Sequence, residues 1–166
     1  MVAVPGWIDL EWFSRHSSQA LLLGGLFLGV ATVVPSMLLV IPGVAFIAEG
    51  LLLKAAVRLE AGPIIRLGTA SLGGFIAGGY FLWVGLIDGI AALAVVGAIF
   101  IGGALTILDR VGTVPAPAIG VGGFGALAAV GVLEGTPLYT GLGVVGALFF
   151  AWFWRRDPYQ SMTVEP

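Results

Sequence analysis

The chain has 166 residues, of which 59% are hydrophobic and only 10% are charged, with a mean hydropathy of +1.10 and a formal net charge of −2. A soluble domain carries about 25% charged residues, so this composition excludes a water-soluble globule and indicates long apolar segments in a lipid bilayer. Cysteine is absent, which excludes disulfides, thiolate metal sites, iron–sulfur clusters and cysteine nucleophiles. The few basic residues form no stripe that could neutralise several phosphates, so no nucleic-acid partner is expected.

Long apolar segments predict several membrane-spanning helices. The first apolar run is too long for one straight span, and Pro35 and Pro42 lie inside it, so a kink or break is expected there. We expect residues 44–60 to be an interfacial segment or an extension of the first span. Asp88-Gly89 is a turn-forming dipeptide between two apolar segments and predicts a tight antiparallel hairpin. The expected spans are 20–41, 67–87, 90–108, 116–133 and 137–154, between an extracytoplasmic interfacial segment at 1–19 and a cytoplasmic tail at 155–166.

The basic residues predict the orientation of these spans, because Lys and Arg near span ends are enriched on the cytoplasmic side. With five spans, Arg15 falls on one side and all other basic residues fall on the opposite side. The predicted fold is therefore all-α: a polytopic transmembrane helical bundle of about five spans, with its N-terminus outside and its C-terminus in the cytoplasm. The residues on the predicted cytoplasmic side are Lys54, Arg58, Arg66, Arg110, Arg155 and Arg156.

Aromatic residues at the predicted span ends indicate anchors at both membrane–water interfaces, where Trp and Tyr are enriched. A cleaved signal peptide is a competing interpretation of the N-terminal region, but no small-x-small cleavage site follows the apolar run. Scarce lysine and abundant glycine, alanine and valine suggest a high-GC genome, and we expect the cell membrane of a prokaryote or a membrane derived from it. The predicted interface anchors are Trp7, Trp12, Trp83, Trp152, Trp154, Arg155 and Arg156.

Glycine accounts for 27 of the 166 residues, which is about twice its usual frequency. Two GxxxG spacings, Gly25 to Gly29 and Gly74 to Gly78, fall inside predicted spans and would let helix backbones approach closely. Such a face can serve self-association, or it can serve ordinary packing within one bundle. We favour packing within one bundle.

Glu49 is the ionisable residue that lies closest to membrane depth. A charge at the bilayer centre costs roughly 2.5 kcal/mol or more, so an ionisable group at depth is a functional hypothesis by default. If the first helix continues past Pro42, Glu49 lies near the inner boundary, where it could form an intramembrane or interfacial charge pair with Lys54 or Arg110. We favour the interfacial salt bridge.

The sequence contains no recognisable catalytic constellation. The chain has a single histidine, His16, so it contains no HExxH motif. His16 is expected outside the membrane, so Ser71 has no base inside the bundle. Asp88 and Asp109 lie at opposite ends of one span, about 30 Å apart at helical rise, which excludes an aspartate dyad. No catalytic, cofactor-binding or metal-binding residue is predicted, and no cofactor is expected.

We therefore expect a non-catalytic integral membrane protein that acts as a structural or accessory subunit of a larger membrane assembly. Its partners would be the lipid bilayer and other membrane subunits or copies of itself. The alternative is a small transporter or channel formed by a homo-oligomer, and a lipid-modifying or lipid-moving protein is a third possibility. In the transporter hypothesis, the pathway would be lined by Ser36, Thr69, Ser71 and Thr106.

Overall fold

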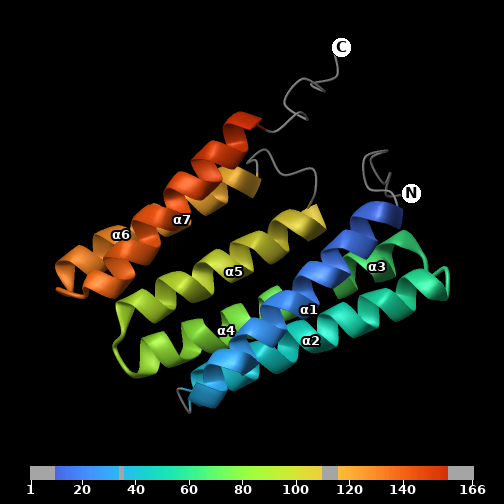
Figure 1. The fold of residues 1–166 in the computed structure, drawn as a ribbon, viewed down its shortest axis with the longest axis horizontal. Helices are drawn as coiled ribbons and strands as arrows, with labels where there is room; N and C mark the ends of the chain where they lie inside the picture. Colours follow the sequence, from blue (N-terminus) through green and yellow to red (C-terminus); the bar gives the residue numbers. More distant parts are fainter. Residues whose placement is uncertain (1–9, 34–35, 110–115, 157–166) are drawn as a thin grey trace. The chain divides into compact units, whose positions relative to one another are not determined.

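The structure is a computed structural model that describes residues 10–33, 36–109 and 116–156 (Figure 1). These residues are helical apart from short connections, and none of them forms a strand. The helices are α1 (Leu10–Val33), α2 (Met37–Arg58), α3 (Pro63–Ala70), α4 (Leu72–Ile87), α5 (Ala91–Asp109), α6 (Ala116–Leu133) and α7 (Pro137–Arg156).

Four helical segments are long and apolar enough to cross a bilayer, which confirms the all-α class and fits a helical membrane bundle. The chain divides into two compact units, Met1–Val111 and Gly112–Pro166. The first unit contains α1 to α5, and the second contains α6 and α7. The four apolar segments are Phe13–Val33, Met37–Arg58, Pro63–Ile87 and Ala91–Leu108.

The first apolar run forms two helices rather than the single span expected at residues 20–41. The first helix starts earlier than expected, at Leu10, and ends at Val33, while α2 begins at Met37. The Ser36 side chain caps α2 by accepting a hydrogen bond from the Leu38 amide at 3.2 Å, which satisfies a free donor of the first turn. Pro42 lies inside α2, where the loss of one backbone hydrogen bond is tolerated. Residues 44–58 therefore belong to a second apolar helix.

The first two helices, α1 and α2, lie side by side and run in opposite directions (Figure 1). A Cβ atom on Gly24 would lie 2.7 Å from the Gly43 carbonyl oxygen, and one on Gly50 would lie 2.8 Å from the Ser17 carbonyl oxygen. These contacts place the beginning of α1 beside the end of α2. The two backbones approach so closely because glycine has no side chain at these positions.

Helices α4 and α5 form a second antiparallel hairpin, with the turn at Asp88-Gly89 as predicted. Gly89 has a φ of 68°, a conformation that glycine adopts without the steric cost of a Cβ atom. A Cβ atom on Gly78 would lie 2.7 Å from Ile101 Cγ1, and one on Gly74 would lie 3.0 Å from Ala104 Cβ. The Gly74–Gly78 face is therefore used for packing inside the chain.

The second unit is one antiparallel hairpin of α6 and α7. A Cβ atom on Gly131 would lie 2.7 Å from Thr140 Oγ1, and Gly146 packs against the ring of Phe124. Phe124 stacks on Phe150 with ring centroids 5.6 Å apart. In all three helical hairpins, glycines let the two helices pack closely, which explains much of the high glycine content.

Four phenylalanines, one each from α1, α2, α4 and α5, fill the middle of the first unit. Phe46 and Phe100 have ring centroids 5.5 Å apart, and Phe100 stacks on Phe81 at 5.9 Å. Phe27 stacks on Phe46 at 6.1 Å. The central region of this unit is therefore packed with aromatic side chains.

Candidate functional site

Glu49 lies on α2 and is only 2% exposed, although a buried carboxylate is costly unless hydrogen bonds or opposite charges compensate it. Each of its two oxygens accepts one hydrogen bond. Oε1 lies 2.9 Å from Nε2 of His16 on α1, and Oε2 lies 2.6 Å from the backbone nitrogen of Gly73 on α4. The carboxylate therefore joins three helices. Along α2, Glu49 lies roughly 14 Å from Arg58 at the rise of an α-helix.

The third apolar segment is broken beside this carboxylate. Helix α3 ends at Ala70 and α4 begins at Leu72, with Ser71 as the residue between them. The break leaves two backbone groups that bond to His16 and Glu49. The Ala70 carbonyl oxygen lies 2.9 Å from His16 Nε2, and the Gly73 amide donates to Glu49. A carbonyl only accepts hydrogen bonds, so Nε2 carries the hydrogen and shares it between Ala70 and Glu49.

Glu49 acts as an N-terminal cap of α4 that is supplied by another helix. A carboxylate at a helix N-terminus is stabilised by the free amides and the helix dipole of the first turn. A Cβ atom on Gly73 would lie 2.5 Å from Glu49 Oε2 and 2.7 Å from Phe46 Cδ1. Glycine at this position therefore lets the carboxylate reach the backbone. We refer to His16, Glu49, Ala70 and Gly73 as the polar junction.

His16 gives the polar junction limited access to its surroundings, because its side chain is 21% exposed whereas that of Glu49 is 3% exposed. The sequence does not predict this contact, because His16 is expected outside the membrane, before the first span. A signal was present in the sequence: Phe13, Ser17 and Ala20 are spaced as one face of a helix, and all three are buried. This spacing extends the packed helix back past His16.

The contact of His16 with Ala70 also brings a histidine next to Ser71, for which the sequence predicts no base inside the bundle. The Ser71 hydroxyl donates to the Gly68 carbonyl at 3.0 Å, and His16 Nε2 faces Glu49 and Ala70. Within the described part of the chain, these bonds link no serine hydroxyl to the histidine. The arrangement holds α1, α2 and the junction of α3 with α4 together.

The expected partners of Glu49 are placed differently. Lys54 is exposed on α2, and the hydrogen bonds that Glu49 accepts come from His16 and Gly73 instead. Arg110 lies outside the described residues. The contact with His16 comes from the antiparallel packing of α1 on α2, which the expected single span over residues 20–41 did not include.

The two GxxxG faces differ in their surroundings. Gly74 and Gly78 pack against α5, whereas Gly25 and Gly29 on α1 are exposed, and no atom lies within 4 Å of a Cβ atom built on either. Among the described residues of the first unit, the Gly25–Gly29 face of α1 is exposed.

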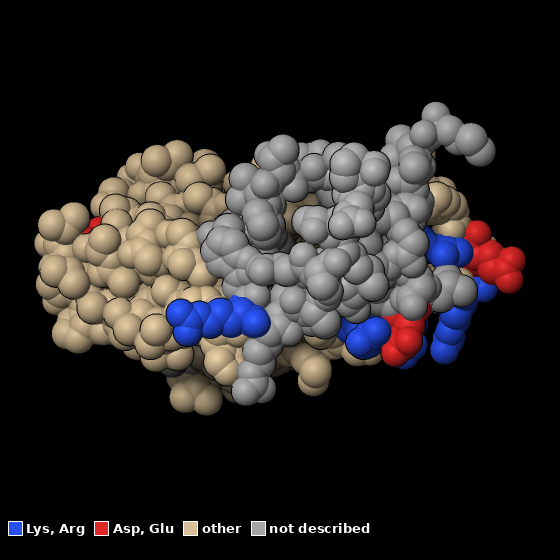
Figure 2. Space-filling view, turned by 90° about the horizontal axis from the view of Figure 1, so that it is seen from above, with Lys and Arg blue, Asp and Glu red and all other residues tan. Residues whose placement is uncertain are grey.

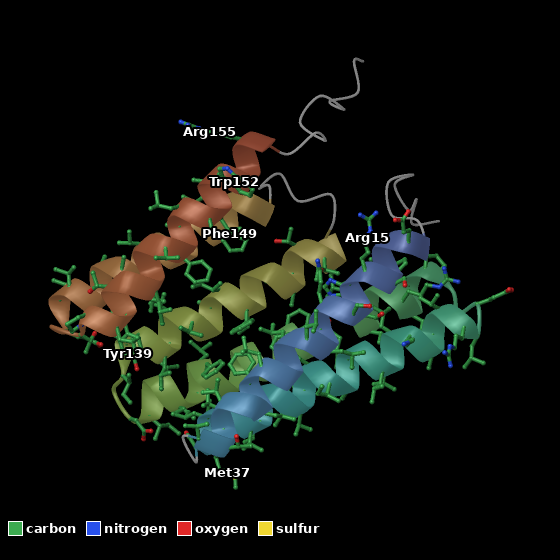
Figure 3. The ribbon with its side chains drawn as sticks, in the orientation of Figure 1. Arg15, Met37, Tyr139, Phe149, Trp152 and Arg155 are labelled. Atoms are coloured by element: carbon green, nitrogen blue, oxygen red, sulfur yellow. The ribbon has the colours of Figure 1, made fainter. Side chains whose placement is uncertain are left out.

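Of the predicted interface anchors, Trp83, Trp152 and Arg155 are exposed on α4 and α7. Figure 3 shows Trp152 and Arg155 near one end of α7, with Tyr139 toward the other. Trp7 lies outside the described residues. Trp12, Trp154 and Arg156 belong to helices, but their side chains lie outside the described part of the structure.

The hydroxyl groups proposed to line a pathway bond to backbone groups close to them in sequence. Thr69 donates to the Ile65 carbonyl and Thr106 to the Gly102 carbonyl, each at 2.8 Å. Ser36 caps α2, as described above. These bonds do not join the hydroxyls into a shared polar path.

Arg66 lies near the polar junction, on α3. Its guanidinium carbon lies 5.9 Å from the ring centroid of Phe13, within the range of a cation–π interaction. Its buried Nε has no hydrogen-bond partner in the structure. Among residues 10–33, 36–109 and 116–156, no group of three or more His, Asp or Glu residues could hold a metal ion.

Comparisons with protein-family models, with curated proteins and with solved structures find no match to this chain.

Proposed function

We propose that the protein is a non-catalytic component of a membrane, a structural or accessory subunit that packs against partner helices in a larger assembly. The interior of the first unit supports this proposal. Its buried charge is bonded to His16 and Gly73, and four phenylalanines fill its middle. These groups stabilise the bundle, and a stable bundle is what a packing subunit requires.

The observation that carries the proposal is the uncovered GxxxG face of α1. The glycines of the other GxxxG pair are in contact with α5, but Gly25 and Gly29 leave open space in which a partner backbone could lie. Exposed neighbours Leu22, Leu26 and Val33 would give the partner an apolar contact surface. Small residues at such a face favour helix association in membranes, because they let backbones approach closely.

The proposal is tested by purifying the tagged protein in a mild detergent and measuring the mass and composition of the particle. We expect another membrane protein to copurify at a fixed stoichiometry. The double variant Gly25→Leu/Gly29→Leu should lose this partner while keeping its own thermal transition, since the added side chains meet open space. The matched control Gly122→Leu/Gly125→Leu, on open positions of α6, should retain the partner.

The alternative of a small transporter or channel formed by a homo-oligomer has one specific observation in its favour. The third apolar segment is interrupted at Ser71, beside the buried carboxylate of Glu49. Interrupted helices with ion-binding groups at the break are common in secondary transporters. A pure homo-oligomer that carries a solute or ion flux into liposomes, with no other protein bound, would replace the subunit proposal by this alternative.

A further inference from the structure

The helices of the structure require a new count of membrane crossings. Helices α1 and α2 are antiparallel, and so are α4 and α5, so each pair returns the chain to the side from which it started. The expected topology counted residues 20–41 as one span and treated 44–60 as its continuation. The presence of α2 as a separate apolar helix changes an odd number of crossings into an even number.

The second unit does not change this parity. Helices α6 and α7 are antiparallel, so the end of α7 returns to the side on which α6 begins, whether or not the hairpin crosses the bilayer.

The basic residues of the first unit lie at one end of it. Arg15 marks the beginning of α1, and Met37, at the beginning of α2, lies at the opposite end (Figure 3). Figure 2 shows basic and acidic side chains together at the end where α1 begins. At the opposite end of the unit, the α4–α5 turn carries the acidic Asp88. The basic residues described in this unit are Arg15, Lys54, Arg58 and Arg66.

Exposed apolar side chains adjoin these charges. Leu59 follows Arg58 at the end of α2, and Ile64 and Ile65 precede Arg66 on α3, with all three apolar side chains exposed. Apolar groups next to cations suit the boundary between acyl chains and headgroups, where the cations meet lipid phosphates. The acidic Glu11 and Glu60 lie at the same end, and Glu11 pairs with Arg15 at 3.4 Å, but acidic residues contribute little to the orientation rule, so the Lys and Arg residues point this end toward the cytoplasm.

We infer that this basic end is the surface of the first unit that meets the cytoplasmic headgroups, so the beginning of α1 faces the cytoplasm. Because α1 and α2 are antiparallel, Arg15 lies on the same side as Lys54, Arg58 and Arg66. The expected extracytoplasmic N-terminus left Arg15 as an exception, and this topology removes the exception. The inference does not depend on the proposed function.

Single cysteines test the inference, because the native chain has none. Glu11→Cys and Gly62→Cys place a thiol at the basic end, and Asp88→Cys places one at the opposite end; all three positions are exposed. Intact cells are treated with a membrane-impermeant maleimide, and permeabilised cells serve as the reference for total labelling. We expect Asp88→Cys to react in intact cells, and labelling of the other two variants to be lost until the cells are permeabilised.

Two outcomes would overturn the inference. Labelling of Glu11→Cys but not Gly62→Cys in intact cells would restore an odd number of crossings between these positions and the original orientation. Labelling of both, with protection of Asp88→Cys, would place the basic end outside. An N-terminal epitope tag on the otherwise native chain gives a second measurement that needs no substitution: antibody binding to the tag in intact cells would also contradict the inference.

Discussion

Replacement of Glu49 by glutamine tests the role of the polar junction. Both groups that Glu49 binds are donors, namely the Nε2–H of His16 and the backbone N–H of Gly73. A glutamine side chain has one acceptor oxygen and one NH2 group, which is a donor. The variant can therefore satisfy one of the two partners, and the other donor faces a second donor in a buried site. A change of the His16 tautomer would restore that contact but leave the Ala70 carbonyl without its hydrogen.

The expected cost follows from these losses. An unsatisfied buried donor costs about 1–3 kcal/mol, and removal of a negative charge from a helix N-terminus costs about 0.3–1 kcal/mol. Hydrogen bonds between membrane helices contribute less, about 0.6 kcal/mol on average, because the unfolded chain in the membrane also finds partners. We therefore expect Glu49→Gln to lower the free energy of unfolding by about 2 kcal/mol, toward the middle of the range for a buried group.

The free energy of unfolding is measured by titrating the purified protein with sodium dodecyl sulfate in mixed micelles, with tryptophan fluorescence as the signal of unfolding. Glu60→Gln is the matched control, because Glu60 is exposed in the turn just after the same helix and should change stability by less than about 0.5 kcal/mol. A double-mutant cycle of Glu49→Gln with His16→Ala separates the contribution that the contact between Glu49 and His16 makes to stability. Equal stability of Glu49→Gln and Glu60→Gln, or strictly additive effects in the cycle, would refute the assignment of Glu49 as the group that joins the three helices.

Two further substitutions test the packing of the first unit. Gly78→Ala should destabilise the protein by about 1–3 kcal/mol, because the added methyl group would lie 2.7 Å from Ile101 Cγ1, whereas Gly79→Ala, in open space on the same helix, should be neutral or slightly stabilising in the same titration. Phe100→Ala should cost about 2–4 kcal/mol through loss of the central aromatic contacts, and Leu105→Ala, at an exposed position of α5, should cost less than about 1 kcal/mol. Similar unfolding midpoints for either substitution and its control would contradict the packing described above.

Local chemistry accounts for the parts of the fold that were predicted correctly. The apolar composition requires helices that satisfy their own backbone groups in a bilayer, so the all-α class follows from composition alone. The turn at Asp88-Gly89 follows from a dipeptide that favours reversal of the chain, and Gly89 has the positive φ that a glycine accommodates best. In both cases, the physical cause acts within one segment.

The division of the first apolar run could not be read from the sequence in the same way. Pro35 and Pro42 are both helix-breaking residues, and the break falls just before Met37, while Pro42 remains inside α2. What favours this arrangement is the fit of α2 against α1 through Gly24 and Gly43, two positions far apart in sequence. Local rules assign a cost to each proline but do not include the packing energy gained when the chain folds back.

The sequence by itself thus determined that the chain is helical and apolar, that a reversal occurs after Ile87, and that Glu49 is an unusual residue for its surroundings. Only the tertiary structure decided where the first reversal occurs, which glycines face a neighbouring helix, and that His16 and the Gly73 amide are the partners of Glu49. The physical reason is distance along the chain. Helix formation and turns depend on neighbouring residues, whereas a buried carboxylate is satisfied by whichever donors the packed helices bring to it.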